Sequence, residues 1–65
     1  MKSYFITVQH AAEMAPDLEN PTEFIRWAED ISAIIAFTYN RDYNEVTEDL
    51  VEKTKEVQNY VGDDD

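Results

Sequence analysis

The chain has 65 residues, of which fifteen are acidic and five are basic, so its formal net charge is -10. This balance excludes direct binding to nucleic acid or to an anionic membrane, because both require cationic side chains. Hydrophobic residues form 43% and aromatic residues 12% of the chain, which excludes an acidic disordered tail.

The length predicts one helical domain over residues 1–62, followed by an acidic tail over 63–65. The chain has no cysteine, so neither a disulfide nor a thiolate metal site can stabilise it. Its longest apolar run, residues 33–37, is far shorter than the ~20 residues that a transmembrane helix needs. No secretory signal pattern follows Met1, and we expect a cytoplasmic protein.

The N-terminal segment fits two periodicities. As a helix over about Ser3–Met14, it places Phe5, Val8 and Ala12 on one apolar face, with Ser3 as the N-cap. As a strand, residues 4, 6 and 8 alternate with residues 5, 7 and 9. A strand would have to pair with another copy of the chain, because the sequence contains no second strand candidate. We therefore predict the helix.

The second and clearest helix is predicted to begin at Pro21. Asn20 is the expected N-cap, Pro21 suits the first helical position, and Glu23 follows the cap by three residues. The expected apolar face consists of Phe24, Ala28, Ile31 and Ile35, flanked by Trp27, Ile34 and Thr38. Beyond residue 32 the opposite side is also apolar, so this end is either buried on all sides or covered by a partner.

The third helix is predicted from Asp42 to Val61, with Asp42 as N-cap and Gly62 as the residue that ends it. Its apolar stripe is expected to contain Tyr43, Val46, Leu50, Thr54, Val57 and Val61. The chain is therefore predicted to be all-α, a small three-helix bundle.

Carboxylates recur along the third helix at helical spacing. Glu45, Asp49, Glu52 and Glu56 follow one another at steps of four, three and four, with Asp42 and Glu48 at the margins. Residues 42–65 hold nine acids and two bases, a net charge of -7. One interpretation is a solvated face that prevents aggregation. The other is a functional anionic surface. It is favoured because only Lys53 and Lys55 interleave with the acids, so few i,i+4 ion pairs relieve the repulsion between like charges.

A functional anionic surface suits a DNA mimic, a protein that occupies the cationic groove of a nucleic-acid-binding protein. In size, charge and expected helicity, the chain looks like the small acidic inhibitors that phages and other mobile elements use against host restriction, CRISPR, repair, transcription or nucleoid proteins. The predicted partner is a basic DNA- or RNA-binding host protein. The expected contact residues are Asp42, Glu45, Glu48, Asp49, Glu52, Glu56, Tyr60, Asp63, Asp64 and Asp65.

An apolar surface offers a different function. Ala33, Ala36, Phe37 and Tyr39 lie away from the main stripes, and aromatic side chains are enriched at interfaces. They would serve a helical adaptor, a homodimer or a subunit of a larger assembly.

Catalysis has little support in the sequence. His10 is the only histidine, and Ser3 and Ser32 have no evident base beside them, so no triad can form. The segment from Asp42 resembles the start of a calcium loop, but it lacks glycine at the sixth position and has Lys53 at the twelfth. We predict a non-enzymatic protein without metal or cofactor.

Overall fold

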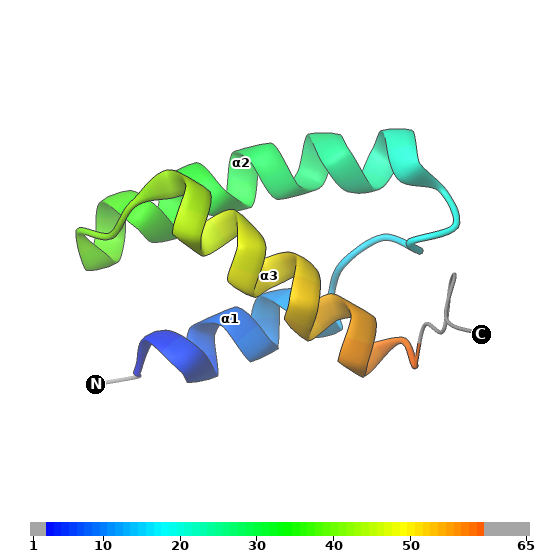
Figure 1. The fold of residues 1–65 in the computed structure, drawn as a ribbon, viewed down its shortest axis with the longest axis horizontal. Helices are drawn as coiled ribbons and strands as arrows, with labels where there is room; N and C mark the ends of the chain where they lie inside the picture. Colours follow the sequence, from blue (N-terminus) through cyan, green and yellow to red (C-terminus); the bar gives the residue numbers. More distant parts are fainter. Residues whose placement is uncertain (1–2, 60–65) are drawn as a thin grey trace.

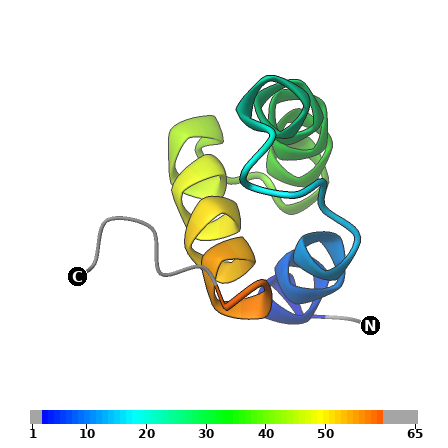
Figure 2. The same ribbon diagram turned by 90° about the vertical axis from the view of Figure 1, so that its right-hand side faces the viewer.

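The computed structural model describes residues 3–59, which form three helices. Helix α1 spans Tyr4–Glu13, α2 spans Pro21–Tyr39 and α3 spans Tyr43–Val57 (Figure 1). Helix α2 runs opposite to the other two, and an end-on view places the helices at three corners of a triangle (Figure 2). The predicted three-helix bundle is confirmed, and the strand alternative for the N-terminal segment is wrong.

Helix α3 holds the bundle together, because it packs extensively against both α1 and α2 while those two contact each other sparsely. Its buried side chains are Val46, Leu50 and Thr54, a run at steps of four. The Thr54 hydroxyl donates to the Leu50 carbonyl at 2.8 Å, so this polar side chain fills its expected place in the stripe at no hydrogen-bonding cost. Tyr43 and Val57, in contrast, are more exposed than the predicted stripe implies.

The other two helices contribute their apolar faces to the same core. The buried residues of α1 are Tyr4, Val8 and Ala12, and those of α2 are Phe24, Ala28, Ser32 and Ile35. The buried face of α1 is thus rotated relative to the predicted one, since Tyr4 rather than Phe5 points inward. On α2, Ile31 is half-buried and Ile34 is exposed.

Two of the three predicted N-caps form their hydrogen bonds. Ser3 Oγ accepts from the Ile6 amide at 3.2 Å, and Asp42 Oδ2 accepts from the Glu45 amide at 3.1 Å. Asn20 occupies the cap position of α2, but its side chain makes no capping bond. Pro21 at the first helical position compensates in part, because it has no amide hydrogen to satisfy.

Helix α3 ends four residues before the predicted Val61. Its C-cap is Gln58, and Asn59 follows in the left-handed region with φ of 52°. The Gln58 side chain accepts from the Leu18 amide at 2.9 Å and donates to the Pro16 carbonyl at 2.8 Å. These bonds hold the end of α3 against the loop between α1 and α2, and Gly62 lies outside the described residues.

Candidate partner-binding site

The acidic face of α3 is the charged feature around which the site is built. Helical spacing places Glu45, Glu48, Glu52 and Glu56 on the side of α3 away from the buried run, and all four are exposed. Asp42 is exposed at the helix N-terminus, where its carboxylate also serves as the cap. Residues 42–59 carry six acids and two bases, so this segment retains a net charge of -4. Tyr60 and Asp63, Asp64 and Asp65 lie outside the described residues.

Asp49 does not belong to the outward face, in contrast to the prediction. It is half-buried against α1, where its Oδ2 accepts a 2.7 Å hydrogen bond from the Tyr4 hydroxyl. The step of 45 residues between the partners explains why spacing along α3 alone could not reveal this bond. Burial first, and then the bond to Asp49 and its negative charge, raise the pKa of Tyr4 well above its usual value.

Arg41 completes this contact at the start of α3. Its guanidinium carbon lies 3.8 Å from the centroid of the Tyr4 ring, and its Nη1 lies 3.3 Å from Glu45 Oε2. A planar cation over an aromatic face is held by the ring's quadrupole as well as by dispersion. The residue therefore connects the loop after α2 to both α1 and α3.

Two carboxylates of the acidic face are paired within the chain. Glu45 contacts Arg41, and Lys53 Nζ lies 3.0 Å from Glu56 Oε1. The two glutamate side chains remain 53% and 68% exposed, respectively. Exposed pairs of this kind contribute about 0.3–0.5 kcal/mol each, so they are easily exchanged for a partner's cation.

Glu48 and Glu52 differ from these two, because within residues 3–59 neither makes a hydrogen bond or an ion pair. Lys55 lies along the same surface of α3 but forms no ion pair with them. The outward carboxylates of α3 therefore consist of two unpaired residues at the centre and one weakly paired glutamate on each side, Glu45 and Glu56.

A groove runs between α1 and α3 beside the acidic face. Its lining residues are Phe5, Val8, Asp49, Glu52, Lys53 and Glu56. Phe5 is 67% exposed, and its ring meets the Tyr4 ring edge-on at a centroid distance of 5.1 Å. The sequence predicted Phe5 in the core, because both Tyr4 and Phe5 lie at helical spacing to Val8. Spacing alone does not decide which of the two aromatic side chains turns inward.

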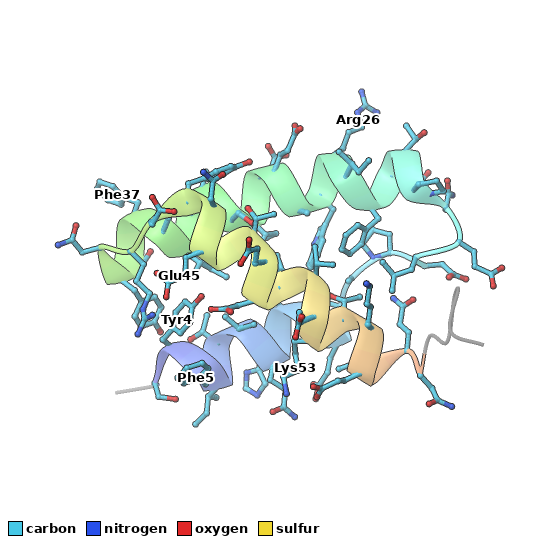
Figure 3. The ribbon with its side chains drawn as sticks, viewed as in Figure 1. Tyr4, Phe5, Arg26, Phe37, Glu45 and Lys53 are labelled. Carbon is cyan, nitrogen blue, oxygen red and sulfur yellow. The ribbon has the colours of Figure 1, made fainter. Side chains whose placement is uncertain are left out.

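The apolar surface predicted on α2 divides into an inner and an outer part. Phe37 is 89% exposed and points away from the bundle (Figure 3), with Ala33 and Ile34 also exposed. Tyr39 and Ala36 instead pack against the core. The Tyr39 and Thr7 hydroxyls are hydrogen-bonded at 2.6 Å, so Tyr39 is half-buried and turned toward α1 rather than outward with Phe37.

Metal sites and membrane-spanning helices are both absent from the described part of the chain. Residues 3–59 contain no group of three or more acidic or histidine side chains placed to hold a metal ion. Over the same residues, no helix combines the length and apolarity needed to cross a bilayer.

The chain matches no protein-family model, and neither the curated proteins nor the solved structures contain a significant match.

Proposed function

We propose that the chain is a non-enzymatic binding protein that engages a basic protein through the outer face of α3. The observation that carries the proposal concerns Glu48 and Glu52, which are exposed and have no cation partner within residues 3–59. They lie between Glu45 and Glu56, whose own ion pairs are exposed. A cationic surface that meets this face gains charge complementarity without breaking a buried contact.

The spacing of these carboxylates supports the finer proposal of a DNA mimic. At 1.5 Å per residue, Glu45 to Glu56 spans about 16 Å. One strand of duplex DNA places a phosphate every ~3.4 Å and so about five over that length. Four carboxylates on a rigid helix thus approach the charge density of a single phosphate strand. The partner in this proposal is a cytoplasmic nucleic-acid-binding protein of a host, and the chain is an inhibitor encoded by a phage or another mobile element.

Neutralising the two unpaired carboxylates tests the proposal. The chain is immobilised, basic proteins are captured from a bacterial lysate, and those that duplex DNA releases are purified and titrated against salt. Glu48→Gln with Glu52→Gln should weaken binding about tenfold and reduce its salt dependence. The matched control is Glu23→Gln with Glu29→Gln on α2, which removes the same charge from another exposed surface. Equal losses in both double variants, or binding insensitive to salt, would contradict the proposal.

A second candidate function is a helical adaptor or homodimer that uses the outer face of α2. It is favoured by the 89% exposure of Phe37 beside exposed Ala33 and Ile34. Sedimentation over a range of concentrations tests it: Phe37→Asp should give a monomer if the face is a dimer interface. Met14→Asp, at the comparably exposed C-cap position that follows α1, is the matched control. A wild-type chain that stays monomeric at all concentrations would rule out the homodimer.

A further inference from the structure

We propose that the groove between α1 and α3 receives an arginine side chain of the basic partner, which stacks on Phe5 and pairs with Glu52 and Glu56. This inference rests on the proposed function and names the chemistry of its anchor point. The groove joins an apolar wall to carboxylates, because Phe5 and Val8 line it from α1 while its charged residues come from α3.

The charges of the groove select a cation. Asp49, Glu52 and Glu56 line it together with Lys53, which is three carboxylates against one ammonium group. Asp49 is half-buried and its Oδ2 accepts from the Tyr4 hydroxyl, whereas Glu52 and Glu56 are exposed and so present the more accessible carboxylates to a partner. Lys53 holds Glu56 in an exposed pair, which an incoming guanidinium can replace.

The chain's own Arg41 shows how a guanidinium is held on this surface. Its central carbon lies 3.8 Å from the Tyr4 ring centroid and 6.0 Å from that of Phe5, while Glu45 approaches its edge at 3.3 Å. An aromatic face below and a carboxylate beside the group are the same two elements that Phe5 and Glu52 offer in the groove. Arginine fits such a site better than lysine, because its planar group stacks and pairs at once.

A second copy of the chain is a poor occupant. Each copy carries a net charge of -10, so like-charge repulsion opposes a contact that places a second copy against the acidic groove. The chain has two arginines, Arg26 and Arg41, and Arg41 is already engaged with Tyr4 and Glu45. The arginine that enters the groove is therefore expected from a basic partner.

Two labelled peptides of equal length, oligoarginine and oligolysine, provide the test by fluorescence anisotropy at low salt. The wild-type chain should prefer oligoarginine, and Phe5→Leu should weaken that peptide about two- to fivefold while leaving oligolysine binding unchanged. The matched control is Ile6→Leu, because Ile6 is exposed on the same helix but does not line the groove. Circular dichroism verifies that both variants keep their helices.

The outcomes separate the two proposals. The arginine site is overturned if both peptides bind with equal affinity and salt dependence and Phe5→Leu has no effect. That result leaves the acidic-face proposal in place. An equal loss for both peptides in Phe5→Leu also overturns it, because the ring would then act without regard to the cation. Absence of salt-dependent binding to either peptide overturns both proposals.

Discussion

Removal of the Tyr4 hydroxyl should destabilise the bundle, because that group joins α1 to α3. Tyr4→Phe keeps the ring, and with it the contacts to Arg41 and to the Tyr39 ring at 5.8 Å, but it deletes the 2.7 Å bond to Asp49. A hydrogen bond to a charged group contributes about 1.5–3 kcal/mol. Since Asp49 is half-buried and water can replace part of the lost bond, we expect a loss of about 1–2 kcal/mol.

That loss is large for a domain of this size. A chain of 65 residues has a free energy of unfolding of roughly 3–10 kcal/mol. The variant should therefore melt about 4–15 °C lower than the wild type. Urea unfolding followed by circular dichroism measures the same change at constant temperature. Tyr43→Phe is the control, because the exposed Tyr43 side chain makes no hydrogen bond in the described part of the chain. It should change stability by less than about 0.5 kcal/mol.

A double-mutant cycle isolates the bond itself. If Tyr4 and Asp49 stabilise each other, Tyr4→Phe combined with Asp49→Ala should cost less than the sum of the single changes, by about 1 kcal/mol. Additive losses, or a Tyr4→Phe variant as stable as the wild type, would refute the interpretation that this bond holds α1 against α3.

Three further predictions concern the same core and its edges. Stability should fall as pH rises above about 10, because the raised pKa of Tyr4 keeps this residue protonated in the folded chain while the unfolded chain loses the proton. Urea unfolding of Tyr4→Phe should show a smaller decline over the same pH range. Ser32→Ala should stabilise the chain by about 1 kcal/mol in the same assay, because Ser32 Oγ is buried without a hydrogen-bond partner among residues 3–59 and alanine favours helix. Gln58→Ala should cost about 1–3 kcal/mol and increase amide exchange at Leu18, since both bonds to the loop are lost; unchanged exchange would contradict this.

Local signals in the sequence were sufficient to place the helices. Ser3 and Asp42 marked two helix starts, Pro21 marked the third, and each element begins within one residue of its predicted start. These signals work because capping and proline geometry act within one turn of the chain. The end of α3 was missed because it depends on Gln58 reaching a loop that lies 40 and 42 residues earlier.

The candidate site was predictable in outline and not in detail. Periodicity along α3 placed the glutamates outside, since it depends on helix geometry alone. It could not show that Asp49 turns to Tyr4, because that bond depends on how α1 packs against α3. The Arg41–Glu45 pair, in contrast, has a local i,i+4 spacing that could have been recognised in the sequence. The same packing exposed Phe5, which its helical spacing to Val8 and Ala12 had assigned to the apolar face of α1.

Competition with duplex DNA tests the central claim most directly. A basic nucleic-acid-binding protein, captured on the immobilised chain and eluted with salt rather than with DNA, is titrated with the chain at increasing concentrations of duplex DNA. If the outer face of α3 occupies the same groove as a phosphate strand, the apparent Kd for the chain should rise in proportion to the DNA concentration. A ternary complex, with a Kd that does not depend on DNA, would contradict the account.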